Sequence, residues 1–206
     1  ECYENSEALI GSALGSRRNE VYLLTKCGHP RGYGRGDWRE ASLLSSIERS
    51  LERLRTDRVD LIQLHSCELA DLRTGEAISA LERAREQGYA RYIGYSGDGP
   101  AARYAIECGR FDALQTSVSI ADQEAIELTL PLAVKRRMGV IAKRPIANAA
   151  WRYARRPAEP SKTGAACSRK PPTAIILCSS GCVSCRSRLP IWTSSSWCAS
   201  LASTSR

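Results

Sequence analysis

The stretch Val59-Asp-Leu-Ile-Gln-Leu64 decides the fold class, because four of its six residues are apolar. A strand with one wet face alternates apolar and polar side chains, whereas a parallel strand covered on both faces is nearly continuous in apolar residues. Apolar residues at helical spacing lie on either side of it, over residues 44–54 and 78–84. The stretch therefore predicts a parallel strand between two amphipathic helices.

The same alternation continues along the chain. The expected helices are residues 6–14, 44–54, 78–84, 101–108 and 128–137, and the expected strands are residues 21–25, 59–64, 92–95, 113–116 and 140–142. Such alternation implies a parallel sheet with right-handed crossovers, which fits a doubly wound sheet or a (β/α)8 barrel. A dinucleotide-binding doubly wound sheet has Gly-x-Gly-x-x-Gly after its first strand, but Gly32-Tyr-Gly34-Arg-Gly36 has another spacing and opens no helix. We therefore expect an α/β fold, an incomplete (β/α)8 TIM barrel that lacks about three of the eight strands.

Charge divides the chain into two parts. The 206 residues carry 30 Lys and Arg against 22 Asp and Glu, a net charge of +8. Residues 161–206 hold six of these cations and no acid, which leaves 24 − 22 = +2 for residues 1–160. Residues 161–206 also hold twelve Ser and five of the nine Cys. We expect a partial barrel over residues 1–160 and an unstructured Ser/Cys/Arg-rich tail over residues 161–206.

A reading-frame shift near residue 160 is our hypothesis for the tail, because acidic residues and periodicity stop there together. The chain also opens Glu1-Cys2-Tyr3 without Met, so we expect that the natural N-terminus has been lost. Translation of the neighbouring frames of the gene tests the first hypothesis. It is wrong if no frame restores a strand followed by a basic loop.

Two functions could attach to the tail. The spacing Cys178-x3-Cys182-x2-Cys185 is that of an iron–sulfur motif, and Cys198 would complete a four-cysteine zinc site. Chance matches are common in a Cys-rich segment, so we expect no metal site. Basic residues beside Trp192 and Trp197 could bind a nucleic acid, but no helical face gathers them, and we do not favour that function.

The cysteines and the hydropathy indicate where the protein works. The four cysteines of residues 1–160 are isolated and widely spaced, as reduced thiols of a cytoplasmic protein are. No apolar run approaches the roughly 20 residues of a membrane span. We therefore expect a cytoplasmic protein that does not enter the membrane.

Polar residues stand where a barrel keeps its chemistry, at the carboxyl ends of strands and in the loops that follow them. They are Lys26, His65, Ser96, Gln115, Lys143 and Arg144, and Tyr3 stands just before the first helix. Any one of them alone could be an ordinary surface residue. His65 is the strongest candidate, because the chain has only two His and this one directly follows a buried strand.

These residues fall in stretches that resemble the aldo-keto reductase family. The stretches are Tyr3-x-x-Ser6-Glu7-x-x-Ile10-Gly11, Leu24-Thr25-Lys26, Asp60-Leu-Ile-Gln-Leu-His65, Ile93-Gly-Tyr-Ser96 and Gly139-Val-Ile-Ala-Lys-Arg-Pro145. They occur in the family's order and cover about residues 1–156. The resemblance implies a (β/α)8 barrel and an NAD(P)H-dependent oxidoreductase that reduces an aldehyde or ketone, a small carbonyl substrate, to an alcohol.

The resemblance also implies roles for three catalytic residues. Tyr3 would protonate the carbonyl oxygen as hydride arrives at carbon. A free phenol titrates near pH 10, so the ammonium of Lys26 would favour the phenolate and ease proton release. His65 would orient the carbonyl and stabilise the developing oxyanion. The family's Asp five residues before this Tyr lies ahead of the first residue of the chain.

For the cofactor, the resemblance implies NADPH, with NADH as the alternative. Ser96 and Gln115 match the positions that hold the nicotinamide carboxamide, and Gly97 replaces the Asn that many members have there. Lys143 matches a position where many members stack an aromatic ring on the nicotinamide. The stretch along the pyrophosphate holds Arg144, Ile146 and Asn148.

Two alternatives come from other classes of protein. One is a cofactor-binding regulatory subunit of the same fold, and the other is a nucleic-acid binder that acts through the basic tail. The second requires steeply salt-dependent binding that disappears when residues 161–206 are deleted. If the barrel is incomplete, its sheet has open edges, and we expect impaired activity that returns when both ends are restored.

Overall fold

The structure is a computed structural model that describes residues 3, 5–30, 36–119 and 122–147. Its strands are β1 (Leu24–Cys27), β2 (Val59–His65), β3 (Ala90–Ser96), β4 (Ala113–Ser117) and β5 (Gly139–Lys143). Its helices are α1 (Ser6–Leu14), the 3-10 helix η1 (Gly15–Glu20), α2 (Glu40–Leu54), α3 (Leu69–Thr74), α4 (Glu76–Glu86), α5 (Gly99–Glu107), α6 (Glu124–Leu128) and α7 (Leu130–Lys135). Helices and strands alternate, as expected.

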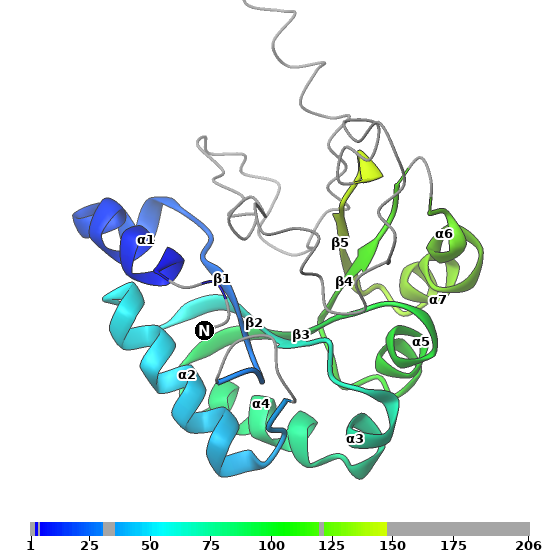
Figure 1. The fold of residues 1–206 in the computed structure, drawn as a ribbon, viewed down its shortest axis with the longest axis horizontal. Coiled ribbons are helices and arrows are strands. Elements are labelled where there is room, and N and C mark those ends of the chain that lie inside the picture. The colour runs from blue at the N-terminus through cyan, green and yellow to red at the C-terminus, as the bar shows by residue number, and fades with distance from the viewer. Residues whose placement is uncertain (1–2, 4, 31–35, 120–121, 148–206) are drawn as a thin grey trace, which may run out of the picture.

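The five strands form one sheet in which every neighbouring pair is parallel. Their order in space is β1-β2-β3-β4-β5, the same as their order along the chain. A doubly wound sheet reverses its order at a switch point, whereas a barrel adds each strand beside the last. The described residues are therefore an arc of a (β/α)8 barrel, and the sheet curves with its helices along the outer side (Figure 1).

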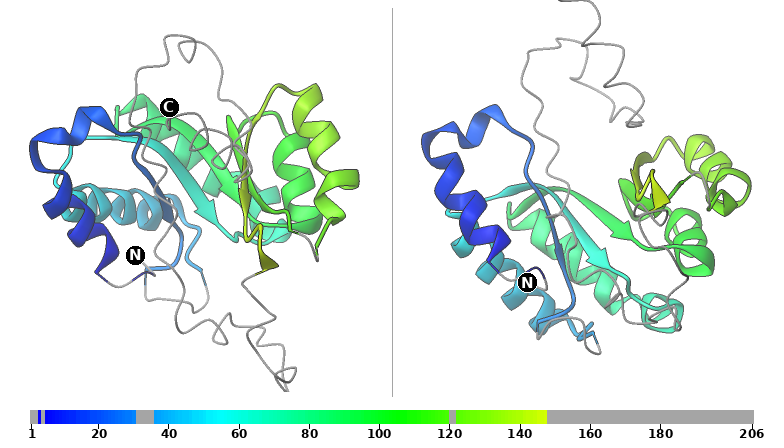
Figure 2. Two further views of the ribbon diagram at one scale, coloured as in Figure 1. Left: turned by 90° about the horizontal axis from the view of Figure 1, so that it is seen from above. Right: turned by 45° about the horizontal axis from the view of Figure 1, so that its top comes forward.

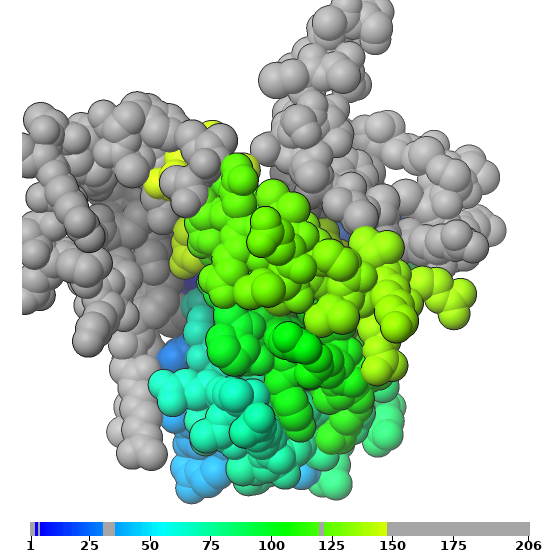
Figure 3. Space-filling view, turned by 90° about the vertical axis from the view of Figure 1, so that its right-hand side faces the viewer, coloured from blue at the N-terminus to red at the C-terminus, as the bar shows by residue number. Residues whose placement is uncertain are grey.

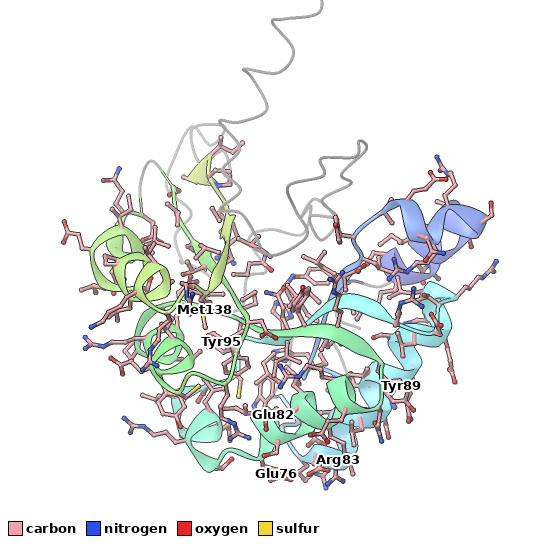
Figure 4. All side chains as sticks on the ribbon, turned by 180° about the vertical axis from the view of Figure 1, so that it is seen from behind. Glu76, Glu82, Arg83, Tyr89, Tyr95 and Met138 are labelled. Atoms are coloured by element: carbon pink, nitrogen blue, oxygen red, sulfur yellow. The ribbon has the colours of Figure 1, made fainter. Side chains whose placement is uncertain are left out.

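The two faces of the sheet differ in chemistry, because side chains alternate along a strand and paired residues share a face. The outer face, against the helices, carries the buried residues Ile62, Leu64, Ile93, Leu114 and Val140. Tyr95 on β3 and Met138 just before β5 join the same core (Figure 4). The inner face carries most of the polar strand residues, including several of the candidate site residues.

The helices continue this core and turn their charged faces outward. In α2 the buried residues Leu43, Ile47, Leu51 and Leu54 recur at helical spacing, as an amphipathic helix requires. On the solvent side, the guanidinium of Arg83 lies 2.6 Å from the carboxylate of Glu40, between α4 and α2. Further views show the same layering of helices outside the strands (Figure 2), and α5 to α7 cover one flank of the arc (Figure 3).

The structure corrects some predicted boundaries. The first strand is Leu24–Cys27 rather than residues 21–25, because the N–H of Leu23 donates to the carboxylate of Asp60 at 2.8 Å instead of joining the ladder. The helix expected over residues 128–137 is the shorter α7 (Leu130–Lys135), and α6 (Glu124–Leu128) before it was not predicted. Pro131 stands in the first turn of α7, where its missing N–H is tolerated. The helix α3 was not predicted.

Two further predictions concern membrane insertion and the metal-binding motif of the tail. None of the helices in the described part of the chain combines the length and apolar character that a membrane crossing needs. Residues 161–206, with the Cys178-x3-Cys182-x2-Cys185 motif, lie outside the described residues. Within the described ranges, His, Cys, Asp and Glu side chains form no group of three or more placed to hold a metal ion.

Candidate active site

The candidate residues on the strands share the inner face of the sheet. His65 pairs with Ser96, and Ser96 pairs with Gln115, so three strands bring these side chains into one row. Lys26 lies on the same face one row nearer the amino ends, and Lys143 one row nearer the carboxyl ends. Lys26 and Lys143 lie within β1 and β5, not after them as expected, and Gln115 lies in the middle of β4. The register therefore brings all five together on the concave side.

Tyr3, Lys26 and His65 meet at the β1–β2 end of this row. The phenol oxygen of Tyr3 lies 3.3 Å from Nε2 of His65. The two rings are stacked, with centroids 5.6 Å apart and planes at 24°. The ammonium of Lys26 lies 5.7 Å from the centre of the Tyr3 ring. A phenol beside an imidazole and an ammonium can transfer a proton, and the two neighbours can stabilise the negative charge that remains.

Glu7 in the first turn of α1 helps to place this cluster, because Tyr3 directly precedes that helix. Its carboxylate accepts hydrogen bonds from the Thr25 hydroxyl at 2.5 Å and from the Arg53 guanidinium at 2.8 Å. Burial alone would raise the pKa of Glu7, but the hydrogen bond from Thr25 and the charge of Arg53 outweigh it and hold the pKa below its ordinary value. Thr25 is next to Lys26 in β1, so Glu7 ties α1 to the strand that carries the lysine.

A close backbone contact with α2 fixes the same helix one turn further along. A Cβ atom on Gly11 of α1 would lie 2.5 Å from the backbone oxygen of Arg53 in α2. Only glycine allows the two helices to approach this closely. Glu7 and Gly11 therefore each have a structural reason to stand where they do in α1.

Gly97, where the family resemblance predicts Asn, is set by its neighbour Tyr95. A Cβ atom on Gly97 would lie 2.3 Å from the Tyr95 hydroxyl oxygen. That hydroxyl donates to the backbone carbonyl of Cys67 at 2.8 Å, and burial raises the pKa of the phenol. Cys67 itself is 1% exposed, and burial raises the pKa of its thiol. Cys67 is therefore a buried side chain of the hydrophobic core.

Asp98, just after Gly97, organises the β4–β5 end of the row. One carboxylate oxygen accepts from the Thr116 hydroxyl at 2.8 Å and from the backbone N–H of Ser117 at 2.6 Å. The other lies 2.9 Å from the ammonium of Lys143 and 3.7 Å from the guanidinium of Arg144. One carboxylate thus joins the loop after β3 to the ends of β4 and β5.

The charges of this cluster shift one another. Burial alone would raise the pKa of Asp98, but Lys143 and the hydrogen bonds from Ser117 and Thr116 outweigh it, and the pKa is lowered. Burial lowers the pKa of Lys143, and the carboxylate of Asp98 offsets only part of that effect. Arg144 also donates to the Ser117 hydroxyl at 2.8 Å. Lys143, Arg144 and Asp98 thus place two cations and one anion at the β4–β5 end of the row.

The remaining predicted residues are less enclosed. Ile146 is 57% exposed. Asn148 lies outside the described residues. The structure therefore brings seven of the nine predicted residues to one edge of the sheet, in two clusters joined by Ser96 and Gln115.

Three residues of this edge were missed by sequence reasoning: His29, Trp38 and Asp98. His29 donates from Nε2 to the backbone carbonyl of His65 at 2.7 Å, and its ring also contacts Trp38. For His29 and Asp98, a signal was available in the sequence. His29 is the other of the two histidines and lies three residues after Lys26, while Asp98 lies two residues after Ser96.

Comparisons with known proteins show the family and the fold of the chain. The sequence profile of the Aldo/keto reductase family matches residues 1–189. An uncharacterized oxidoreductase, YqkF of Bacillus subtilis (strain 168), is 30% identical over 147 residues, which are 69% of this chain and 47% of that protein. The match to the family profile runs past residue 160, and the boundary that we place there stays a prediction.

Solved structures share the fold. The holo form of aldo-keto reductase AKR11C1 from Bacillus halodurans superposes with a TM-score of 0.64 at 29% identity, over 74% of this chain and 52% of that one. An aldo/keto reductase from Klebsiella pneumoniae in complex with NADP and acetate gives 0.58 at 26% identity, over 69% and 49%. The chain spans about half the length of these relatives.

Proposed function

Because this chain belongs to the Aldo/keto reductase family, we propose that it reduces an aldehyde or ketone to an alcohol by hydride transfer from NADPH. The observation that carries the proposal is the 3.3 Å approach of the Tyr3 phenol to His65, with the ammonium of Lys26 against the same phenol ring. This proton donor, its orienting imidazole and its cation stand at the end of barrel strands where substrates bind.

The reaction needs a hydride at the carbonyl carbon and a proton at the carbonyl oxygen. A reduced nicotinamide, when bound, supplies the hydride. Tyr3 gives its phenol proton to the oxygen, whose lone pair forms the new O–H bond as the carbonyl π bond opens. Lys26 stabilises the negative charge left on the Tyr3 oxygen, and His65 orients the carbonyl by a hydrogen bond to its oxygen. These groups stabilise charge that develops on the way to the transition state, which is how catalysis is gained.

The next part of the row fits the proposed cofactor. Ser96 and Gln115, paired across β3 and β4, offer a hydroxyl and an amide to a nicotinamide carboxamide. Lys143 and Arg144 together carry more charge than Asp98 neutralises, which favours a phosphate-bearing ligand. We assign Ile146 and Asn148 to the same cofactor stretch. NADPH is the cofactor we favour, and NADH is the alternative.

The same proposal covers the organisation of the chain. We infer that residues 1–160 carry the reaction and that residues 161–206 take no part in it, because the charge and composition change between them. The isolated and widely spaced cysteines of residues 1–160 suit a reducing compartment, which supports a cytoplasmic location.

Replacement of Tyr3 by Phe tests the proposal. The unchanged chain should oxidise NADPH in the presence of a panel of aldehydes and ketones, measured by the absorbance of the reduced nicotinamide at high protein concentration. Tyr3→Phe should lower kcat by about 10²–10⁴-fold, the usual contribution of a general acid. The NADPH dissociation constant, measured by quenching of tryptophan fluorescence, should not change. Equal turnover by the two chains contradicts the proposed role of Tyr3.

A further inference from the structure

His29, the second histidine of the chain, lies against the last residue of β2. Its Nε2 atom is 2.7 Å from the backbone carbonyl oxygen of His65. The two imidazole centroids are 5.3 Å apart and their planes meet at 87°, an edge-to-face contact. Because a carbonyl oxygen can only accept, Nε2 of His29 carries the hydrogen. His29 therefore holds His65 both at its backbone and at its ring.

The peptide group between His65 and Ser66 is held at both of its polar atoms. Its N–H donates to the backbone oxygen of Ser96 on β3 at 2.7 Å, and its carbonyl accepts from His29. Ser66 has a φ of 59°, so the chain leaves the strand at this peptide. The β1–β2 ladder ends one residue earlier, at the pair Cys27–Leu64. The imidazole of His29 supplies the donor on the β1 side beyond the end of the ladder.

Trp38 makes a second edge-to-face contact with His29. The indole and imidazole centroids are 5.5 Å apart, with planes at 82°. The indole lies against two glycines, because a Cβ atom on Gly28 would be 2.1 Å from Cζ3 of Trp38 and one on Gly36 would be 2.4 Å from Cζ2. The N–H of Asp37 donates to the Gly28 carbonyl at 3.0 Å. The two described ends of this loop are thus closed around the indole, and His29 is enclosed between Trp38 and His65.

We propose that His29 is a positioning residue for the reduction. It fixes the His65–Ser66 peptide and the His65 ring so that Nε2 of His65 faces the phenol oxygen of Tyr3, 3.3 Å away. His29 acts through His65 rather than on the carbonyl. The inference rests on the proposed function, because the pair of Tyr3 and His65 is the part of the site that meets the substrate. A small displacement of such a pair is enough to slow the reaction.

Two substitutions of His29 separate its hydrogen bond from its bulk. His29→Phe keeps a flat ring and removes the donor, whereas the amide of His29→Gln can place an N–H close to the position of Nε2. We expect His29→Phe to lower kcat by about 10–100-fold, with the KM for the carbonyl changed less than about threefold. We expect His29→Gln to stay within about threefold of the unchanged chain in both constants. A loss of packing alone does not produce this rescue.

Two kinetic results overturn the inference. One is a kcat of His29→Phe within about threefold of the unchanged chain, and the other is an equal loss in His29→Gln and His29→Phe. Thermal unfolding of both variants, followed by circular dichroism, verifies that each compared chain is folded.

A second measurement does not depend on turnover. The chain has two His, so in either variant the one remaining imidazole is that of His65. Two-bond ¹H–¹⁵N correlation spectra over a pH series should give a changed His65 titration curve in His29→Phe and an unchanged one in His29→Gln. An identical curve in all three chains overturns the inference. If the unchanged chain reduces no carbonyl, the proposed function fails, and these spectra alone decide the role of His29.

Discussion

Two lysines lie on the inner face of the sheet, Lys26 buried and Lys143 partly buried, and they differ in what lies next to each ammonium. Lys143 lies 2.9 Å from the carboxylate of Asp98. Lys26 lies 5.7 Å from the centre of the Tyr3 ring. A cation paired with a carboxylate is compensated before any ligand arrives, whereas a cation beside a phenol can stabilise a charge that appears during proton transfer. We therefore propose that the β1–β2 end of the row carries out the chemistry and that the β4–β5 end binds the cofactor.

Each lysine also has a carboxylate that fixes the backbone around it, by different routes. Asp98 pairs with Lys143 directly and accepts the N–H of Ser117. Glu7 bonds the hydroxyl of Thr25, the residue before Lys26, and the guanidinium of Arg53. Loss of Asp98 should therefore change the charge at Lys143, while loss of Glu7 should change the position of α1 and Tyr3.

Replacing each lysine by Met gives the largest expected contrast. Lys26→Met should lower kcat by about 10²–10³-fold, since it removes a charge aimed at the transition state. Lys143→Met should raise the NADPH dissociation constant by about tenfold and lower kcat much less. Steady-state kinetics and fluorescence titration with NADPH measure both constants. An equal loss of kcat in the two variants contradicts the division between the two ends.

Glu7→Gln should lower the free energy of unfolding by about 2 kcal/mol at neutral pH, because the partly buried Arg53 loses its counterion. The pKa of Glu7 is lowered from 4.5, so its contribution is full above that pH and is lost as the pH falls through the lowered value. The difference between the two chains should therefore shrink in acid. Urea unfolding at a series of pH values measures it.

The exposed residue Glu86 in the last turn of α4 is a matched control for Glu7. Glu86→Gln should change the free energy of unfolding by less than about 0.5 kcal/mol at every pH. A constant difference between Glu7→Gln and the unchanged chain down to the acid limit contradicts the role given to the Glu7 carboxylate.

Asp98→Asn should lower the free energy of unfolding by about 1–2 kcal/mol at neutral pH. This is no more than the effect of Glu7→Gln, because the Asp98 carboxylate is partly exposed and solvent screens its ion pair with Lys143. Asn can still accept hydrogen bonds from Thr116 and Ser117, but it leaves the partly buried ammonium of Lys143 without its counterion. The pKa of Lys143, already lowered by burial, should fall further. The loss should diminish at alkaline pH, where Lys143 is neutral and needs no counterion.

Asp57→Asn is the control for Asp98, because the Asp57–Arg58 pair lies on the surface with the Asp57 side chain 80% exposed. It should change the free energy of unfolding by less than about 0.5 kcal/mol. If Asp98→Asn is no more destabilising than Asp57→Asn, the ion pair with Lys143 does not organise this end of the row.

Periodicity predicted the order of the elements, because apolar residues at helical or strand spacing report burial directly. The apolar residues of the stretch 59–64 and the helix residues Ile47 and Leu51 are buried as expected. Boundaries failed where a side chain replaced a backbone partner, as Asp60 does at Leu23. The strand order, which separates a barrel from a doubly wound sheet, depends on pairing between strands and is visible in the structure.

The candidate site was predicted residue by residue, but its internal contacts were not. Lys26, His65 and Tyr3 stand at positions that a barrel and the family resemblance both indicate. The contacts of His29 with His65 and of Asp98 with Lys143 link residues 36 and 45 positions apart (65 − 29 and 143 − 98), and no local pattern reports such contacts. Gly97 likewise depends on the place of the Tyr95 hydroxyl.

Transfer of deuterium from NADPH labelled at its transferable hydride position tests the central claim most directly. Mass spectrometry of the alcohol formed from an aldehyde should find the deuterium on the former carbonyl carbon with the unchanged chain. Tyr3→Phe should form labelled alcohol at least about 10²-fold more slowly. Alcohol that carries no deuterium, or label transferred equally fast by Tyr3→Phe, would contradict hydride transfer assisted by the Tyr3 phenol.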